Sequence, residues 1–200
     1  MGVCYIVGAS EMQNRINPSD GDLVIAADGG YKHLEKTGIA PDMIIGDFDS
    51  AELPDCKNRI CFPAEKDDTD MMLCIKYGFE KGYREFKIYG SLGGKRTDHT
   101  VANIQSLAYI AEHGGKGFLI NRNEMFTVIK NSEIILNGND GYFSVFAFGS
   151  EAKGVSISGG KYPLDNVVLS PSFPLGVSNQ FVGNDVKISV KDGCLLIYAS

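Results

Sequence analysis

The sequence has no excess of basic residues and no long apolar run. Its 19 Lys and Arg residues are outnumbered by 25 Asp and Glu residues, which gives a net charge of −6. We therefore expect no strongly basic face, and this argues against nucleic acid as a partner. No apolar run approaches the roughly 18 residues that a membrane helix needs, so we expect no membrane partner either. The hydrophobic fraction of 44% is still large enough to bury a core.

Cysteine does not occur in the patterns that would give it a covalent or metal-binding role. Five cysteines are present, an odd number, and none forms a C-x-x-C pair. Cys4, Cys74 and Cys194 lie in apolar runs, where cysteine usually packs as a small hydrophobic residue. The N-terminal "MGVCYIVGAS" lacks the basic flank and long apolar core of a signal peptide. We expect reduced thiols, an N-terminal strand and a cytoplasmic protein.

Several catalytic motifs are missing as well. The sequence has no G-x-S-x-G nucleophile motif, no P-loop and no G-x-G-x-x-G dinucleotide fingerprint. Phosphoryl-type transfer does not require them, because it depends mainly on positioning and charge neutralisation. The Asp, Arg, Lys and Gly residues of the motifs below suit that class of reaction.

Residues 1–121 alternate short apolar strands with helical patterns. The strands are predicted at runs rich in β-branched and aromatic residues: "VCYIV", "LVIAA", "MIIG", "RICF", "FKIYG" and "GFLI". Helices are predicted in "DDTDMMLCIKYGFEKG" and in "DHTVANIQSLAYIAEHGG". This alternation predicts an α/β domain with a mostly parallel sheet.

The two predicted helices show apolar residues at helical spacing. In the first, Met72, Ile75 and Phe79 share one face, and Asp68 or Thr69 can cap the N-terminus. In the second, Val101, Ile104, Leu107 or Ala108, and Ala111 recur at the same spacing. This spacing supports the prediction that both segments are helices.

After residue 121 the helical period disappears. Short strand patterns follow one another, separated by the turn signals "NGNDG", "SGG" and "KDG". This rhythm is typical of antiparallel sandwiches and barrels. We therefore predict an all-β sandwich or barrel domain over residues 122–200.

Carboxylates follow several predicted strands of the α/β domain. "DMIIGDFDS" places Asp47 and Asp49 one residue apart where an apolar strand ends, and Asp28 follows another strand. Asp70 and Asp98 lie where the two predicted helices begin. Because ligands bind at the carboxyl ends of strands in such sheets, we expect these groups at one edge. Crowded carboxylates need a cation, and oxygen ligands alone favour Mg²⁺ over Ca²⁺.

Two of these signals also have simple structural explanations. Asp67 and Asp68 could be a helix cap alone. Asp28 before Gly29 and Gly30 could be a plain turn residue. The pair Asp47 and Asp49 favours function, because a loop that needs only solubility rarely follows a buried strand so abruptly.

The glycine-rich segment "GSLGGKRTDH" supplies the opposite charge. Gly93 and Gly94 let the backbone approach phosphate oxygens, and the following helix offers free N–H groups. Lys95 and Arg96 add positive charge for a polyphosphate. His99 fits a first-turn helix residue better than a general base.

Five motifs, in their order and spacing, resemble the thiamine pyrophosphokinase family along nearly the whole chain. "GDFDS" and "DDTD" together are specific, whereas either alone is not. The motifs are "AADGG", "PDMIIGDFDS", "KDDTDMML", "GGKRTDHTVANI" and "KYPLDNVVL…GVSNQF".

The resemblance implies an activity and an assembly. The activity is transfer of pyrophosphate from the co-substrate ATP to thiamine, which gives thiamine diphosphate and AMP. The α/β domain, residues 1–121, would bind the nucleotide and carry the catalytic groups, and residues 122–200 would bind thiamine and form the dimer. In the expected homodimer, thiamine lies between the first domain of one subunit and the second domain of the other.

The resemblance also implies roles for individual residues of the first domain. Asp47, Asp49 and Asp70 match the family's magnesium and catalytic carboxylates. Arg96 and Asp98 match its phosphate and active-site loop. Nucleotide-binding positions are expected at the two glycine motifs: Asp28, Gly29, Gly93, Gly94, Lys95 and Arg96.

In the second domain, Tyr162 falls where the family places an aromatic residue against thiamine. Ser178 and Asn179 fall at its thiamine-contacting Ser-Asn pair. An aromatic face suits a flat cation such as thiamine. From the residues alone, Tyr162 before Pro163 reads more simply as a strand-edge residue, and Asn179 as a turn residue.

Two departures from the family pattern concern the loops. "GSLGGKRTDH" is one residue longer than the usual form, which leaves open whether Lys95 or Arg96 holds the phosphate. Gly160 stands where the family commonly has an apolar residue, and this could loosen the pocket wall. Which carboxylate orients the thiamine hydroxyl, Asp98 or a metal-bound one, also stays open.

Two other functions remain alternatives from the sequence. An apolar strand followed by D-x-D is also typical of haloacid-dehalogenase-like phosphatases, although Ala51 stands where Thr or Val is usual there. A non-catalytic module that binds nucleotide or thiamine is the second alternative. It would gain nothing from so many carboxylates facing a polyphosphate.

Overall fold

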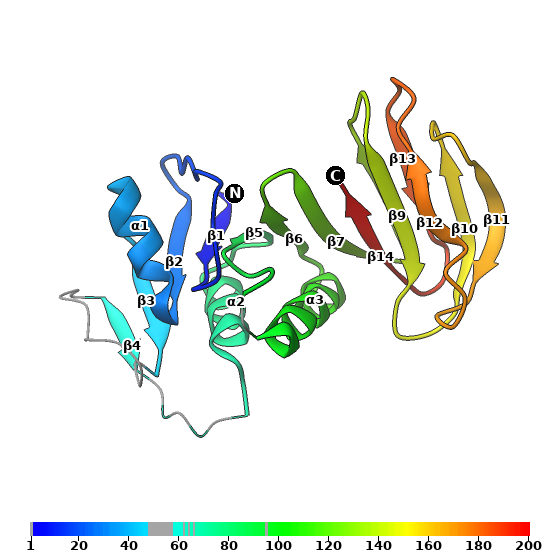
Figure 1. Cartoon of the computed structure of the whole chain (residues 1–200). Coiled ribbons are helices and arrows are strands. Elements are labelled where there is room, and N and C mark those ends of the chain that lie inside the picture. Colours follow the sequence, from blue (N-terminus) through cyan, green and yellow to red (C-terminus); the bar gives the residue numbers. More distant parts are fainter. Residues whose placement is uncertain (1, 48–57, 62, 64, 66, 95) are drawn as a thin grey trace. The chain divides into compact units, whose positions relative to one another are not determined.

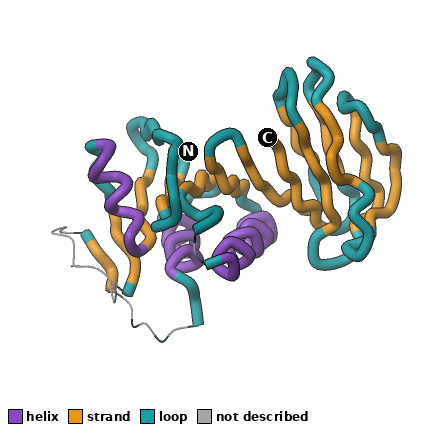
Figure 2. Tube along the Cα trace, viewed as in Figure 1, coloured by secondary structure: helices purple, strands orange, loops and turns teal. Residues whose placement is uncertain are grey.

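The computed structural model of the chain divides into two compact units, Met1–Arg122 and Asn123–Ser200. It describes residues 2–47, 58–61, 63, 65, 67–94 and 96–200. The first unit combines a sheet with helices and the second is β throughout, which confirms the predicted fold class in outline. The described helices all belong to the first unit (Figure 2).

A parallel sheet forms the centre of the first unit (Figure 1). Its order is β6-β5-β1-β2-β3-β4, and each neighbouring pair is parallel. The strands are β1 Cys4–Val7, β2 Leu23–Ala27, β3 Met43–Gly46, β4 Arg59–Cys61, β5 Glu85–Tyr89 and β6 Lys116–Asn121. Because β1 lies between β2 and β5, the strand order reverses at β1, which makes the edge beside β1 and β5 a topological switch point.

The helices of the first unit begin near the carboxyl ends of strands. They are the 3₁₀ turn η1 Asp28–Gly30 and the α-helices α1 Tyr31–Thr37, α2 Asp70–Glu80 and α3 Thr97–Glu112. Thr69 caps α2, because its hydroxyl accepts a hydrogen bond from the Met72 N–H at 3.2 Å. The start of α2 is thereby fixed, and with it the position of Asp70.

The buried faces of α2 and α3 differ from the predicted ones. On α2 the buried residues are Met71, Cys74, Ile75 and Gly78. On α3 they are Asn103, Ser106, Leu107 and Ile110. Val101, which the helical spacing groups with Leu107, has an exposed fraction of 54%.

The second unit consists of two antiparallel sheets, one ordered β12-β9-β14-β7 and the other β11-β10-β13-β8. The strands are β7 Glu124–Lys130, β8 Glu133–Leu136, β9 Tyr142–Ala147, β10 Ala152–Ser158, β11 Leu164–Leu169, β12 Gly176–Gln180, β13 Val186–Ser189 and β14 Cys194–Ala199. Apolar residues of both sheets, among them Phe143, Val155, Ile188 and Leu195, form one buried core. The core lies between the sheets, as in other sandwiches.

Two expectations from the sequence concern covalent links and membranes. No disulfide joins any two of the described cysteines, Cys4, Cys61, Cys74 and Cys194. Within the described residues, no helix has the length and apolar character needed to cross a membrane.

The edge beside β1 depends on a glycine that approaches the backbone closely. A Cβ atom at Gly30 would lie 1.9 Å from the Val7 carbonyl oxygen, so no other residue fits there without movement of β1 or η1. We predict that Gly30→Ala lowers the free energy of unfolding by about 1–3 kcal/mol, the usual cost of overpacking. Urea unfolding followed by circular dichroism would measure it.

Gly29→Ala is the matched control, because the nearest atom to its added Cβ would be the Ala9 Cβ at 3.3 Å. We expect a clearly smaller loss of stability for this variant. Equal losses in both variants would show that the contact with Val7 does not determine the effect.

Candidate active site

A cavity of ≈ 270 Å³ opens at the carboxyl ends of β1, β2, β3 and β5. This volume is near the lower end of the range typical of small-molecule sites. Four carboxylates line it, from the ends of two strands and from the start of α2: Asp28, Asp47, Asp68 and Asp70. The predicted convergence of acidic residues at one sheet edge is therefore present for Asp28, Asp47 and Asp70.

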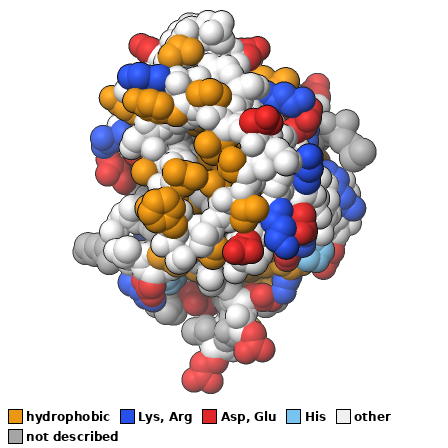
Figure 3. Space-filling view, turned by 90° about the vertical axis from the view of Figure 1, so that its right-hand side faces the viewer, with side chains coloured by type: hydrophobic (Ala, Val, Ile, Leu, Met, Phe, Trp, Pro, Cys, Tyr) orange, Lys and Arg blue, Asp and Glu red, His pale blue; other side chains and the backbone are white. Residues whose placement is uncertain are grey.

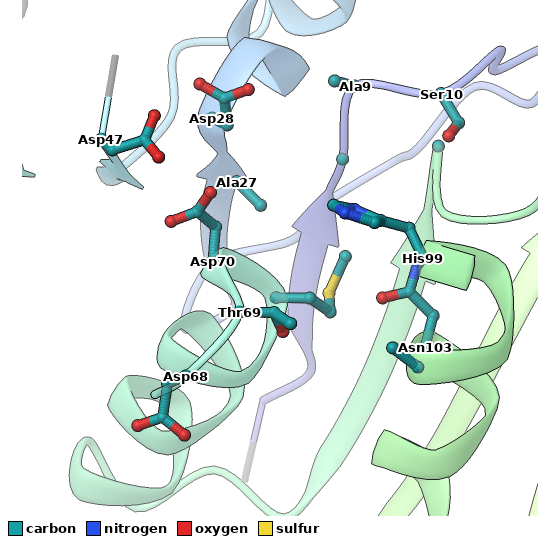
Figure 4. A pocket seen from close by; sticks show the side chains of 14 residues that line it. Ala9, Ser10, Ala27, Asp28, Asp47, Asp68, Thr69, Asp70, His99 and Asn103 are labelled. Carbon is teal, nitrogen blue, oxygen red and sulfur yellow. The ribbon is translucent and has the colours of Figure 1, made fainter. Parts of the chain in front are cut away.

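The register of the sheet brings these three carboxylates together. Asp28 directly follows β2 and Asp47 directly follows β3, and these two strands are neighbours. They approach closely at this edge, since a Cβ atom at Gly46 would lie 2.9 Å from the Asp28 Cα. Figure 4 shows the side chains of Asp28, Asp47 and Asp70 on the same side of the cavity.

Asp28 has an uncommon backbone conformation. Its φ of 48° lies in the left-handed region, which residues other than glycine adopt rarely. Such strained positions cluster at functional sites, where the surrounding structure enforces them. This conformation favours a role for Asp28 beyond that of a turn residue.

Asp68 forms an ion pair with Lys76. Lys76 Nζ lies 2.8 Å from Asp68 Oδ1 and 2.6 Å from Asp68 Oδ2. The hydrogen bonds to Asp68 raise the pKa of Lys76. Asp68 also lies apart from the other carboxylates in Figure 4. The pair thus offsets one of the four negative charges that line the cavity.

The donor set fits Mg²⁺ better than a cage-forming metal. Within the described residues, no three His, Cys, Asp or Glu side chains are close enough together to hold one ion. Mg²⁺ does not need such a cage, because it usually takes one or two carboxylates and completes its shell with water and substrate phosphates. Asp47 and Asp70 can serve as those carboxylates.

The opposite wall comes from β1, β5 and α3. Gly8 and Gly90 follow β1 and β5 and approach so closely that a Cβ at Gly8 would lie 2.5 Å from the Gly90 oxygen. His99 and the buried Asn103 line the cavity from α3, and Ser10 lines it from the loop after β1. Figure 4 shows the His99 ring extending toward the loop after β1.

Sequence reasoning missed most of this wall. It did not single out Gly8, Ser10, Gly90 or Asn103, and it treated His99 as a first-turn helix residue only. The signal available for Gly8 and Ser10 was "VGAS", a glycine and a serine directly after an apolar strand.

Two hydroxyl groups connect the predicted glycine-rich loop, residues 90–94, to its surroundings at the cavity. Gly93 and Gly94 have φ values of 71° and 83°, so both need the conformational freedom of glycine. The hydroxyls of Ser10 and Thr100 donate to the Gly93 carbonyl at 3.5 Å and 3.3 Å. The loop is thus tied to a cavity residue on one side and to α3 on the other.

Arg96 and Asp98 form an exposed bidentate pair at the start of α3. Arg96 Nε lies 3.0 Å from Asp98 Oδ1, and Arg96 Nη2 lies 2.7 Å from Asp98 Oδ2. Neither residue lines the cavity. The hydrogen bonds from Arg96 lower the pKa of Asp98 to about 2, with a smaller contribution from the His99 N–H. Asp98 is therefore a carboxylate held in its ionised form.

The predicted thiamine residues lie in the second unit. Tyr162 precedes β11 and is 56% exposed. Ser178 and Asn179 belong to β12, where Ser178 is exposed and Asn179 is buried. Asn179 hydrogen-bonds the backbone of Tyr162 on both sides, N–H and carbonyl, so these two residues are in direct contact. Asp49 and Lys95 lie outside the described residues.

Comparisons with known proteins agree in both units. Residues 18–119 match the family model described as thiamin pyrophosphokinase, catalytic domain, and residues 131–195 match the model for its vitamin B1 binding domain. The thiamine pyrophosphokinase of Bacillus subtilis is 30% identical over 188 residues, which cover 89% of this chain and 87% of that protein.

Solved structures show the same similarity. The B. subtilis thiamine pyrophosphokinase superposes with a TM-score of 0.87 at 27% identity, over 99% of this chain and 98% of the other. The thiamin pyrophosphokinase of Geobacillus thermodenitrificans gives a TM-score of 0.86 at 25% identity, over 99% and 97%.

The Arg96–Asp98 pair gives a direct electrostatic prediction. In Arg96→Gln, Asp98 loses its charged partner, so its pKa should rise from about 2 toward the ordinary value of 3.8. Carboxyl-carbon NMR titration of Asp98 in both proteins would measure the change. A pKa that stays near 2 without Arg96 would mean that the His99 N–H, and not the guanidinium, holds the charge.

Proposed function

This chain belongs to the thiamine pyrophosphokinase family, and from that premise we propose how its two units perform the reaction. The enzyme transfers the pyrophosphoryl group of ATP to thiamine and releases AMP. The observation that carries this conclusion is the convergence of Asp28, Asp47 and Asp70 in a chain that matches both the catalytic and the vitamin B1 binding models. A phosphatase or a simple binding module is not favoured, because neither accounts for both matches.

We propose that Asp47 and Asp70, together with Asp49, hold Mg²⁺ on the triphosphate. The ion would neutralise charge on the phosphates and fix their orientation. The ends of β3 and the start of α2 position Asp47 and Asp70 independently of any ligand. Asp28, held in a strained conformation beside them, would bind within the same shell of water and phosphate oxygens.

The glycine loop and α3 would bind the phosphates from the other wall. Gly93 and Gly94 lack side chains that would keep the backbone away from phosphate oxygens, and the positive end of the α3 dipole would favour an anion. Arg96, and Lys95 beside it, would stabilise the negative charge that develops during transfer. Asp98 holds the guanidinium of Arg96 in a fixed orientation before ATP binds.

The low pKa of Asp98 bears on which carboxylate receives the thiamine hydroxyl proton. A group with a pKa of about 2 is a poor base near neutral pH, because efficient general bases have pKa values near the working pH. We therefore propose that Asp98 orients Arg96, and that a carboxylate of the cavity receives the proton of the thiamine hydroxyl. The hydroxyl oxygen would attack the β-phosphorus in line, and AMP would leave.

Thiamine recognition is assigned to the second unit. Tyr162 is exposed, and an aromatic ring suits the flat cationic substrate. Ser178, which is also exposed, would offer a hydroxyl group to it. The match of residues 131–195 to a vitamin B1 binding model supports this assignment.

We further propose that the enzyme is a homodimer formed through the second unit. This unit exposes several large apolar side chains close together in sequence: Phe173, Leu175, Val177 and Val182. Figure 3, which views the molecule from the side of β10 and β11, shows apolar side chains gathered near the middle of a face. Exposed patches of this kind mark interaction sites in soluble proteins.

The carboxylate assignment predicts the behaviour of Asp70→Asn. With ATP, Mg²⁺ and thiamine, the unchanged protein should form AMP and thiamine diphosphate in equal amounts. Asp70→Asn should lower kcat at least about 100-fold, since it removes preorganised charge at the reacting phosphates. It should also raise the Mg²⁺ concentration that gives half-maximal rate.

Asp20→Asn, at an exposed turn of the first unit, is the matched control and should keep full activity. Full turnover by Asp70→Asn with an unchanged Mg²⁺ dependence would remove Asp70 from the site.

If the homodimer forms through the exposed apolar side chains of residues 173–182, a charge placed among them should lower the mass of the assembly in solution. Val177→Asp should shift the protein toward monomer in sedimentation or light scattering, because a buried unpaired charge opposes association. Val101→Asp, on α3 and similarly exposed, should leave the mass unchanged. A monomeric unchanged protein would contradict the dimer itself.

A further inference from the structure

The side chain of Asn179 binds both backbone polar groups of Tyr162. The Tyr162 N–H donates to Asn179 Oδ1 at 3.0 Å, and Asn179 Nδ2 donates to the Tyr162 carbonyl at 2.7 Å. The Gln180 N–H also donates to Asn179 Oδ1, at 2.9 Å. The amide of Asn179 therefore pairs with a single residue of the neighbouring segment in the way one strand pairs with another.

Burial and hydrogen bonding leave Asn179 little capacity to contact a ligand. Only 4% of the residue is exposed, whereas Tyr162 is 56% exposed. An amide oxygen accepts two hydrogen bonds, and Asn179 Oδ1 already has two. The two residues thus have different roles: Tyr162 is exposed, with Lys161 Nζ 5.4 Å from the centre of its ring, and the amide of Asn179 supports the backbone that carries the ring.

The segment before Tyr162 is held without help from Asn179. Gly160 pairs with Phe181, and the Lys161 N–H donates to the Gln180 carbonyl at 3.0 Å. Lys161 Nζ also donates to Gln180 Oε1 at 2.7 Å. Removal of the Asn179 amide should therefore release Tyr162 and leave residues 160–161 in place.

Gly160 allows this arrangement. A Cβ atom there would lie 2.7 Å from Phe143 Cζ and 3.1 Å from Asn179 Oδ1. An apolar side chain at this position would displace either the Phe143 ring or the amide. Gly160 thus tightens the support of Tyr162 instead of loosening the wall.

We propose that Asn179 is a positioning residue for thiamine, which acts through Tyr162 and not by contact with the substrate. The inference rests on the proposed thiamine site of the second unit. Its physical basis is preorganisation: a backbone fixed before binding does not lose that freedom when the ligand arrives. Truncation of Asn179 should then weaken thiamine binding only as far as Tyr162 contributes to it.

A double-mutant cycle tests this coupling. Tyr162→Ala should raise KM for thiamine about tenfold, as expected for loss of an aromatic contact with a cation. Asn179→Ala should raise it by a similar or smaller factor. The double variant should match Tyr162→Ala alone, because the two residues act on one contact. KM for ATP should stay unchanged in all three proteins.

Each deviation has a distinct meaning. If the double variant shows the product of the two single effects, Asn179 contacts thiamine itself and the inference is overturned. If Tyr162→Ala leaves KM for thiamine unchanged, Tyr162 is not part of the thiamine site, and the proposed site fails together with the inference. If KM for ATP rises equally, the effect of Asn179 is on the fold as a whole.

A fluorescence readout does not depend on activity. The chain contains no tryptophan, so Tyr162→Trp introduces a single reporter. Adding Asn179→Ala should lower the fluorescence anisotropy of that reporter and reduce its quenching by thiamine. An unchanged anisotropy would show that the amide does not hold residue 162, and this result too would overturn the inference.

Asn131→Ala is the matched control. Asn131 Oδ1 accepts a hydrogen bond from the Gly193 N–H at 2.8 Å, so this variant also removes an amide-to-backbone contact from the second unit. The control lies at the other end of β10 from the Tyr162 segment. Asp192, next to Gly193, pairs with Lys153 at the start of β10, whereas Gly160 follows the end of that strand. We expect a comparable loss of thermal stability but no change in KM for thiamine. If Asn179→Ala fails to fold, Asn179→Ser, which also removes the donor to the Tyr162 carbonyl but adds no charge, replaces it in the cycle.

Discussion

The crowding of like charges at one sheet edge is the constraint on which the first unit depends. Parallel strands end on the same side, so the residues after β2 and β3 must meet, and both are aspartates. Gly46 allows the end of β3 to approach Asp28 closely enough for this. Lys76 offsets the charge of Asp68. In the proposed function, a bound cation with a polyphosphate would complete the site and would link ligand binding to the stability of this edge.

How far the sequence predicts this structure depends on the kind of signal. Apolar strands that end in aspartate were recognisable, because strand pattern and carboxylate lie in one short stretch. The buried face of α3 was not, since Asn103 and Ser106 point inward while Val101 is exposed. Asn103 Nδ2 donates to the Ser91 carbonyl at 2.7 Å and so supports the strand end beside the cavity. Hydrophobic periodicity fails here because a functional edge needs polar support from the helix.

Other features depend on contacts between distant segments and leave no local pattern. Gly8 and Gly90 are 82 residues apart in sequence yet nearly touch, and only the pairing of β1 with β5 brings them together. The same holds for Gly78 of α2, where an added Cβ would lie 2.6 Å from the Phe86 ring. Gly78 belongs to the buried face of α2, together with Met71 and Cys74. The Arg96–Asp98 pair lies within one motif, but the bidentate geometry that lowers the pKa of Asp98 to about 2 cannot be predicted from residue identity.

The two units solve different recognition problems by different means. In the proposed function, the first unit would bind a polyphosphate through charge, backbone N–H groups and glycine, and the bound ion would compensate the repulsion in its cavity. The second unit would bind a flat organic cation through an exposed ring, and precision would come from the backbone. There, a buried amide whose oxygen already accepts two hydrogen bonds from the protein would contribute by fixing that backbone. If Asn179 turned outward, its two part-buried hydrogen bonds with the Tyr162 N–H and carbonyl would be lost.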